Sequence, residues 1–187
     1  TAEVNRGMLE QMLPFGIRRV IFHRKNSLED MQSCIKEADF PHEYEAFILN
    51  ELCHFSGAFC NSLHCDELGH LCRVPHKKEE TDAAQKDVAE TDRIQGKEGK
   101  GLPLDEDGYL TGSTGCGLCA LYRMKQVGIT HLKLVGRGNY TDFMEKDIRQ
   151  LRKVLDILEN SDSEAQYQKK MKASLFPDGC SRNCYYR

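Results

Sequence analysis

Apolar and polar residues alternate along this chain with two different periods. Segments with an apolar residue at every third or fourth position predict amphipathic helices, whereas short runs rich in β-branched and aromatic residues predict strands. Because the two kinds of segment alternate, the sequence favours βα units around a parallel sheet. Helices are predicted at 3–13, 28–38, 116–127, 141–159 and 163–175, and strands at 17–22, 45–49 and 129–135.

Individual residues mark several helix ends and one helix face. Ser27 predicts an N-cap, and Asp30 lies three positions later, where it would complete a capping box. Gly128 predicts the end of the helix at 116–127. The long helix at 141–159 is predicted to bury one apolar face. That face comprises Phe143, Ile148, Leu151, Val154, Leu155 and Leu158.

The number of strands bears on the fold class. Only three segments make convincing strands, and three parallel strands with two exposed edges form a poor domain by themselves. The first residue is Thr1 rather than an initiator Met, so the start reads as a cut point inside a longer chain. We therefore expect an α/β fold that is the C-terminal half of a TIM-like (β/α)8 barrel with parallel strands. The N-terminal half of the same barrel is expected to be missing from this chain.

A Cys-rich loop and a charged insertion divide the expected barrel units. The insertion is a run of mixed charges with few apolar residues, which is typical of a solvated segment. The expected parts are βα units with the Cys-rich loop at 1–76, a flexible charged insertion at 77–106, the last βα units at 107–160, and a C-terminal helix with a Cys-containing tail at 161–187.

Composition and charge narrow the class of protein. Hydrophobic residues make up 40% and charged residues 29% of the 187 residues, an ordinary balance for a globular protein. The net charge of −3 creates no global field that would attract nucleic acid or an anionic membrane, although a local basic patch remains open. No apolar run is long enough to span a membrane. We expect a cytoplasmic protein without membrane contact.

Cysteine is the unusual residue of this chain. There are nine cysteines, an odd number, in a chain long enough to build a core without disulfides. Eight of them fall in three clusters, while Cys34 stands alone in a helical pattern. Because one ion or cluster gathers several thiolates, this distribution favours a metal or iron–sulfur site over disulfides or unrelated thiols.

A series of short motifs occurs in the order found in one known family. A Glu-x-Phe strand precedes a Cys, a Ser-Gly pair and a second Cys. These motifs are followed by a Cys-Arg pair, a Leu-Cys at a helix start, a Gly-Ile turn and a strand that leads into Gly-Arg. With these motifs, spread over about residues 5–160, the chain resembles the collagenase-like peptidase family. The matching residues are Glu45, Phe47, Cys53, Ser56, Gly57, Cys60, Cys72, Arg73, Leu118, Cys119, Gly128, Ile129 and 133–137.

The chain departs from the family pattern at two places that bear on chemistry. Val135 stands where the family has a Glu, which would be a candidate acid or base. Asn50 and Glu51 stand where the family has small residues before the first Cys. Chemistry that needs the missing carboxylate is therefore not supported by this sequence.

The resemblance implies a metal centre and supplies a reaction class. Members include proteins described as peptidases and proteins that support hydroxylation of RNA bases or of ubiquinone precursors; in the second group four cysteines hold a 4Fe–4S cluster. Carried over residue by residue, the implied cluster ligands are Cys53, Cys60, Cys72 and Cys119. A zinc ion bound by the sulfur atoms of these cysteines is the alternative, and it could also recruit His54, His64 or His76.

The placement of two of these cysteines makes sense without the family. Cys53 follows the end of a predicted strand, and the strand ends of a (β/α) barrel are where active sites gather. Cys119 opens a predicted helix, where the helix dipole favours a thiolate. Both positions suit ligands at the mouth of a barrel.

Two short cysteine pairs suggest a second metal site. Cys116 and Cys119 form a Cys-x-x-Cys pair, and Cys180 and Cys184 are separated by three residues. Together they could hold a separate metal ion; alternatively, the set is Cys65, Cys116, Cys180 and Cys184. A redox Cys-x-x-Cys at the helix start is a further alternative.

Two basic residues near the third predicted strand are candidate substrate ligands. Arg137 lies in a Gly-Arg-Gly turn between a strand and a helix, where backbone N–H groups and a guanidinium would bind an anion; the alternative is a plain turn. Lys133 points opposite to Leu132 and Leu134, which would place it inside a barrel; the alternative is an edge lysine in solvent.

These observations lead to one leading hypothesis and two rivals. We expect an iron–sulfur-dependent enzyme or enzyme subunit that hydroxylates an RNA base or an aromatic precursor, with a small anionic substrate or RNA and a homologous subunit as partners. A metal-dependent peptidase is the first rival, although no His-Glu-x-x-His or Ser–His–Asp pattern is present. A zinc-stabilised binding module without enzymatic activity is the second.

Overall fold

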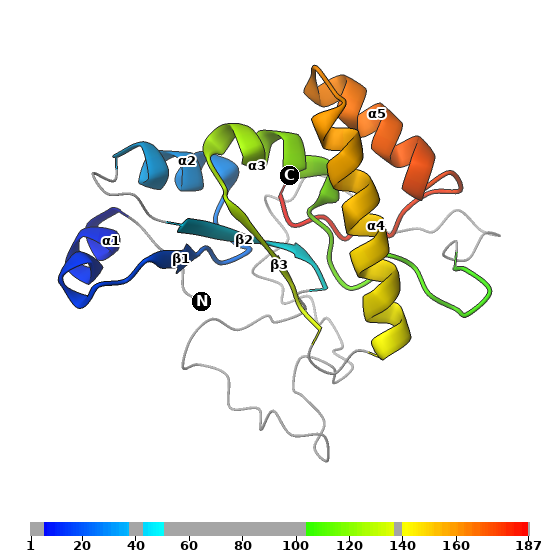
Figure 1. The fold of residues 1–187 in the computed structure, drawn as a ribbon, viewed down its shortest axis with the longest axis horizontal. Helices are drawn as coiled ribbons and strands as arrows, with labels where there is room; N and C mark the ends of the chain where they lie inside the picture. The colour runs from blue at the N-terminus through cyan, green and yellow to red at the C-terminus, as the bar shows by residue number, and fades with distance from the viewer. Residues whose placement is uncertain (1–5, 38–42, 51–103, 137–139, 187) are drawn as a thin grey trace, which may run out of the picture.

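The computed structural model describes residues 6–37, 43–50, 104–136 and 140–186. Helices and strands alternate along them, as the hydrophobic pattern predicts (Figure 1). The elements are α1 (Arg6–Met12), η1 (Leu13–Phe15), β1 (Arg19–Ile21), α2 (Leu28–Glu37), β2 (Glu43–Leu49), η5 (Leu118–Ala120), α3 (Leu121–Val127), β3 (His131–Leu134), α4 (Thr141–Glu159) and α5 (Glu164–Leu175).

The three strands form one parallel sheet in the order β1-β2-β3. Val20 of β1 lies opposite Tyr44 of β2, and Ala46 of β2 lies opposite Leu132 of β3. An irregularity in the ladder between Phe47 and Leu49 shifts the register at the C-terminal end of β2. The sheet confirms the prediction of parallel strands joined through helices, and thus a mixed α/β fold.

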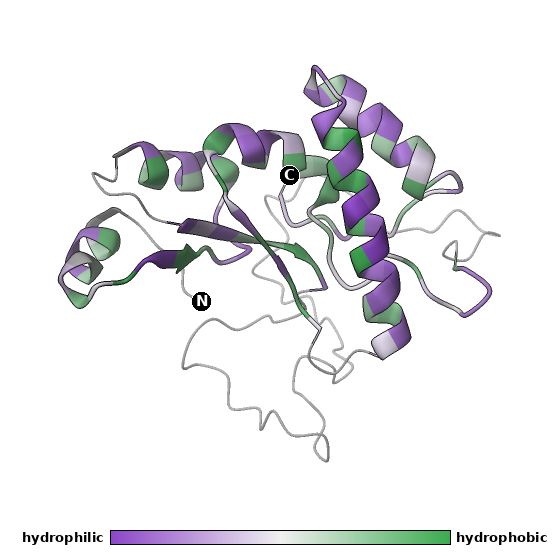
Figure 2. Cartoon of the chain, in the orientation of Figure 1, coloured by the Kyte–Doolittle hydropathy of each residue, from purple (hydrophilic) through white to green (hydrophobic). Residues whose placement is uncertain are grey.

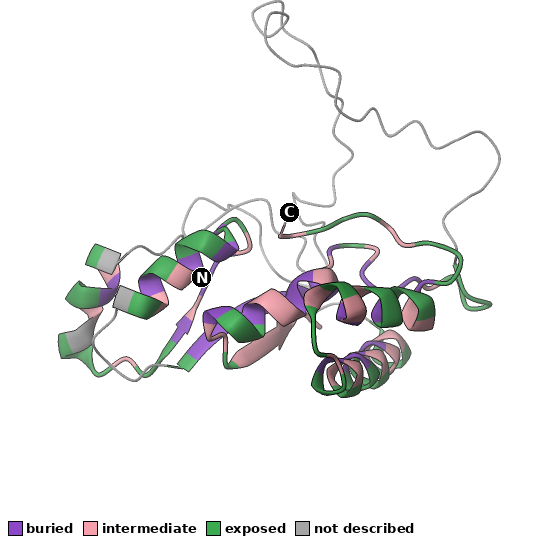
Figure 3. Cartoon of the chain, turned by 90° about the horizontal axis from the view of Figure 1, so that it is seen from above, coloured by how far each residue is buried: buried purple, intermediate pink, exposed green. Residues whose placement is uncertain are grey.

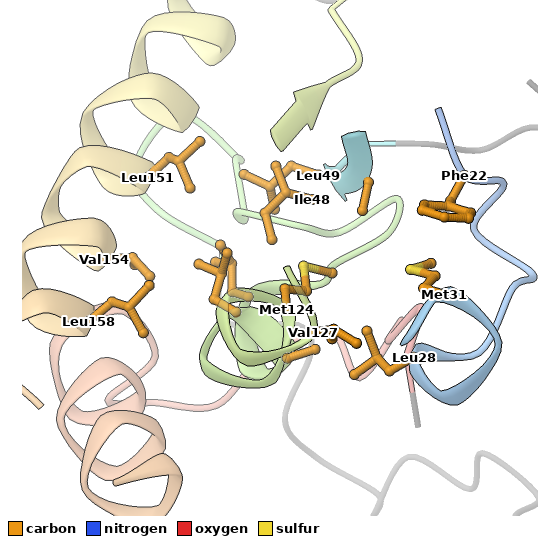
Figure 4. Packing of buried hydrophobic residues seen from close by; sticks show 14 of the residues in the cluster. Phe22, Leu28, Met31, Ile48, Leu49, Met124, Val127, Leu151, Val154 and Leu158 are labelled. Atoms are coloured by element: carbon orange, nitrogen blue, oxygen red, sulfur yellow. The ribbon is translucent and has the colours of Figure 1, made fainter. Parts of the chain in front are cut away.

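One face of the sheet packs against α2 and α3, which lie along the same side of the strands (Figure 1). Ile48 of β2 is fully buried and lies near Met124 of α3, while Met31 of α2 lies near Phe22 just after β1 (Figure 4). Full burial of a side chain the size of Ile48 or Met31 contributes roughly 2 kcal/mol to the free energy of unfolding. This apolar layer fixes the strand ends on which the candidate site is built.

The predicted helix signals at Ser27 and Gly128 are confirmed. The backbone N–H of Asp30 donates to Ser27 Oγ at 3.1 Å, and the Ser27 N–H donates to the Asp30 carboxylate at 3.1 Å, which completes a capping box. Gly128 adopts a left-handed conformation with φ +98°, and its N–H bonds to the carbonyls of Met124 and Lys125. A residue with a side chain would be strained at this helix end.

Helix α4 is amphipathic (Figure 2), but its buried face differs from the predicted one, since Phe143 and Leu155 are only half-buried and Ile148 is exposed. Leu151, Val154 and Leu158 are buried and point toward α3 and the end of β2 (Figure 4). Ile148, by contrast, is 44% exposed, so its prediction as a core residue is wrong. The neighbouring Asp147 is fully buried and lies on the buried face of α4 instead.

Helices α4 and α5 pack side by side, with their outer faces exposed (Figure 3). Ser163 caps α5 by accepting a hydrogen bond from the Gln166 N–H at 3.3 Å. Tyr167 of α5 is fully buried and donates to the Leu118 carbonyl at 2.6 Å. This bond fixes α5, and the tail that follows it, against η5.

Candidate metal centre

Four cysteine side chains line one pocket between η5 and the C-terminal tail. Cys116 and Cys119 come from the segment that enters α3, and Cys180 and Cys184 come from the tail after α5. The remaining lining combines apolar residues such as Phe176 with polar ones such as Thr111 and Arg182. Two segments far apart in the sequence therefore bring their thiols to a single cavity.

The segment that carries Cys116 is attached to the C-terminal end of β2. The Gly117 N–H donates to the Ile48 carbonyl at 2.8 Å, and the Asn50 N–H donates to the Gly115 carbonyl at 3.0 Å. Cys116 also forms an isolated bridge with Leu49. The pocket thus lies beside the carboxyl edge of the sheet, where the active sites of parallel α/β folds gather.

The C-terminal tail is fastened to the same segment through its backbone. The Cys116 N–H donates to the Asn183 carbonyl at 2.8 Å, and the Tyr185 N–H donates to the Cys116 carbonyl at 2.9 Å. A parallel bridge therefore places Cys184 directly opposite Cys116. Gly115 permits this contact, because a Cβ at that position would lie 2.3 Å from atoms of the Tyr185 ring.

Burial controls the protonation of the inner thiols. Burial is the main reason why the pKa of Cys116 rises to about 12; a backbone hydrogen bond from Leu118 lowers this pKa, and the neighbouring thiols of Cys119, Cys184 and Cys180 raise it. Burial also raises the pKa of Cys119, although the nearby Lys172 ammonium lowers it in part. These thiols are therefore protonated at neutral pH unless a cation replaces the protons, as a bound metal ion does.

Of the four cysteines that the family resemblance implies as ligands, the structure describes Cys119 alone. Cys53, Cys60 and Cys72 lie outside the described residues, as do Cys65 of the second predicted set and Arg137. The other members of that second set, Cys116, Cys180 and Cys184, are brought together with Cys119.

The cysteines that the structure describes carry thiols rather than disulfides. Within the same residues, no three His, Cys, Asp or Glu side chains are placed closely enough to hold a metal ion as they stand. Four thiols nevertheless line the same pocket, and the backbone bridge places Cys184 opposite Cys116. The donor set therefore has the chemistry of a thiolate metal site.

Lys133 belongs to a group of charges on one face of the sheet. Its ammonium lies 3.3 Å from the carboxylate of Glu45, which is itself 3.3 Å from the guanidinium of Arg19. The Lys133 ammonium also lies over the Phe47 ring, 5.8 Å from its centroid. The lysine is therefore paired and half-buried. Sequence reasoning did not single out Glu45 as its partner, although a carboxylate inside an otherwise apolar strand is a signal for one.

A buried carboxyl group near the end of β2 also escaped sequence reasoning. Asp147 of α4 is fully buried, accepts a hydrogen bond from Asn50 Nδ2 at 2.5 Å and accepts a second from the Tyr109 hydroxyl. Burial raises the pKa of Asp147, and the two hydrogen bonds oppose that shift. The available signal was its spacing, four residues from Phe143 and four from Leu151, within the apolar stripe of the helix.

The fold and the pocket define a parallel α/β protein with a thiol-lined cavity at the carboxyl edge of its sheet. Comparison with protein families adds that the family model described as peptidase family U32 matches residues 3–186. The chain therefore belongs to peptidase family U32, as the motifs predicted. Neither the curated proteins nor the solved structures include a match to this chain. In the described residues, no helix combines the length and the apolar character needed to cross a membrane.

Proposed function

We propose that this chain is part of an iron–sulfur-dependent enzyme of family U32 that hydroxylates an RNA base or an aromatic precursor. The proposed ligands are Cys53, Cys60, Cys72 and Cys119, and the chain would supply the C-terminal half of a (β/α)8 barrel. The reaction class rests on the resemblance to the iron–sulfur members of the family. When bound, a cluster of this kind supplies one-electron chemistry that side chains alone do not provide.

One observation carries the proposal: the thiol of Cys119 lies in a pocket beside the carboxyl end of β2. Asn50 is the last described residue before the stretch that contains Cys53, Cys60 and Cys72, and its N–H donates to the carbonyl of Gly115. The described chain therefore leads into that stretch from a residue bonded to the neighbour of Cys116. This supports ligands from both segments at one edge of the sheet.

Basic side chains would bind and orient the substrate. Lys133 and Arg19 share the carboxylate of Glu45 on the sheet face opposite α2 and α3, which in a barrel is the interior. Polar groups on such a face suit a polar aromatic substrate. Arg137 is the proposed anchor for an anionic group, since it precedes the N-terminus of α4.

Metal analysis tests this function directly. The full chain, purified without oxygen, is expected to contain iron and acid-labile sulfide, and a Cys53→Ser, Cys60→Ser, Cys72→Ser variant is expected to lose both. A Cys34→Ala variant is the matched control, because Cys34 is a buried thiol of α2 that does not line the pocket. Protein without iron and sulfide under these conditions contradicts the proposal.

A metal-dependent peptidase is the second candidate, and the description of the matching family favours it. A zinc ion with Cys and His ligands and one open position would activate water for hydrolysis. Cleavage of collagen-derived peptides that a chelator abolishes, and that zinc restores, would support this candidate over hydroxylation.

A further inference from the structure

The pocket between η5 and the tail is a site made by the fold rather than by a single motif. A Cys-x-x-Cys pair, Cys116 and Cys119, faces a Cys-x-x-x-Cys pair, Cys180 and Cys184. Short pairs of this kind, supplied by two separate segments, are the usual construction of structural zinc sites with four thiolates. The family correspondence assigns only Cys119 of these residues, so the tail cysteines need an explanation of their own.

Specific bonds hold the tail at the pocket. In addition to the backbone bridge between Cys116 and Cys184, the Ser181 hydroxyl donates to the Gly112 carbonyl at 2.8 Å. The Tyr186 hydroxyl donates to the Phe47 carbonyl in β2 at 3.0 Å. These contacts bind the tail to the turn before η5 and to the central strand, so the approach of the two cysteine pairs is built into the fold.

The size and surroundings of the pocket select the ligand. The cavity is small, with room for a water molecule or an ion. Four thiolates gathered in one cavity need positive charge as a partner, and Arg182 is the one basic residue among those that line the pocket. Lys172, close to Cys119, would offset part of the negative charge of a four-thiolate site.

We propose that Cys116, Cys119, Cys180 and Cys184 bind one Zn²⁺ ion that fastens the C-terminal tail to the carboxyl edge of the sheet. As they are placed, these thiols do not form a group that could hold a metal ion, so binding would require side-chain rotation and a movement of the tail. Zinc suits this role, since four thiolates give it a closed tetrahedral shell and it takes no part in redox chemistry.

This proposal is independent of the proposed function except at Cys119, which can serve only one of the two centres. The zinc proposal assigns Cys119 to zinc, so the cluster of the proposed function would then keep Cys53, Cys60 and Cys72 as its ligands. The iron and zinc contents of single variants therefore separate the two proposals.

The test measures zinc and cobalt binding by the full chain. Protein purified without oxygen is expected to bind one zinc ion per chain, and Co²⁺ in its place is expected to show the sulfur-to-metal charge-transfer and d–d bands of a tetrahedral thiolate site. Cys180→Ser with Cys184→Ser should lose the zinc and the cobalt bands while keeping iron. Cys34→Ala, and the variant lacking Cys53, Cys60 and Cys72, should keep both zinc and cobalt bands.

Several outcomes would overturn the zinc proposal. One is a wild-type chain that takes up no zinc, and another is a tail variant that keeps its zinc and an unchanged cobalt spectrum. Loss of iron but not of zinc in Cys119→Ser would remove that residue from the zinc site and return it to the cluster. A disulfide between Cys116 and Cys184 in protein handled without oxidant would also refute the proposal, since it would use two of the four ligands.

A second readout does not depend on metal analysis. Zinc is expected to raise the midpoint of thermal unfolding of the wild-type chain and to protect the tail against proteolysis. The tail variant should unfold as the zinc-free wild type does, with or without added zinc. An equal rise in both proteins would show that zinc acts elsewhere on the chain.

Discussion

At the scale of single residues, the buried carboxyl group of Asp147 joins three separate parts of the chain. It lies on α4, accepts a hydrogen bond from Asn50 at the end of β2 and accepts another from Tyr109 in the loop before η5. Asn50 itself has a positive φ of 67°, a conformation that few side chains tolerate. The carboxyl group therefore fixes the strand end beside which the thiol pocket lies.

Truncation of this side chain should be costly. In Asp147→Ala, the Asn50 amide and the Tyr109 hydroxyl would lose their acceptor inside the protein, and such groups cost about 1–3 kcal/mol each when left unsatisfied. We expect urea unfolding to show a loss of roughly 2–6 kcal/mol in the free energy of unfolding for the two groups together. Ile148→Ala is the control on the neighbouring position, whose side chain is 44% exposed, and it should change stability little.

Ionisation of Asp147 should also leave a signature in the pH dependence of stability. Burial raises its pKa above the ordinary value of 3.8, so the folded chain retains this proton to a higher pH than the unfolded chain does. Its contribution to the free energy of unfolding therefore falls as pH rises from about 3.8 through the folded pKa.

The variant Asp147→Asn removes this titration and keeps the shape of the side chain. The stability of the variant relative to wild type should increase as pH rises through that window, because only the wild type bears the cost of a buried charge. Urea unfolding at a series of pH values measures the difference. A difference that stays constant with pH would show that Asp147 titrates alike in both states.

At the scale of elements, local signals located the helices and strands well. The capping box at Ser27 and the left-handed Gly128 are encoded within a few residues and match the structure, and the apolar period of α4 matches it except at Ile148. The pairing of the tail with the segment around Cys116 is different, because it joins distant residues through backbone groups. Sequence reasoning grouped these cysteines by type and spacing, yet left open whether Cys65 or Cys119 completes the set.

Docking of the tail depends on the absence of a side chain at Gly115. An added Cβ would lie 2.3 Å from Tyr185, and the φ of +149° is itself unfavourable for other residues. Gly115→Ala should therefore displace the tail, with a loss of about 1–3 kcal/mol from overpacking and backbone strain. Gly108→Ala is the control, since its φ is +74° but no atom lies within 4 Å of the added Cβ.

Limited proteolysis with mass spectrometry, together with urea unfolding, compares the two glycine variants. Faster cleavage after α5 in Gly115→Ala than in Gly108→Ala would confirm that Tyr185 packs on this glycine. Equal cleavage and equal stability would mean that the tail is held by its other contacts alone.

At the scale of the whole molecule, the two faces of the sheet are stabilised by different forces. The face toward α2 and α3 is apolar, whereas the opposite face carries Glu45 between Arg19 of β1 and Lys133 of β3. Glu45 lies on the central strand and so connects all three strands through charge. In a complete barrel, this polar face would line the interior and the proposed substrate would meet it.

Replacement of this central carboxylate tests whether the charge network holds the sheet together. Glu45→Gln keeps the volume of the side chain but loses both ion pairs, and because its side chain is only 10% exposed we expect a loss of roughly 1 kcal/mol in the free energy of unfolding. Glu43→Gln is the matched control, because this carboxylate is 51% exposed and pairs with Arg19 alone. Its effect should be smaller and should vanish in high salt, since exposed pairs are screened. Equal losses in the two variants, or an effect of Glu45→Gln that salt abolishes, would show that the network lies at an open surface rather than on a sheltered face.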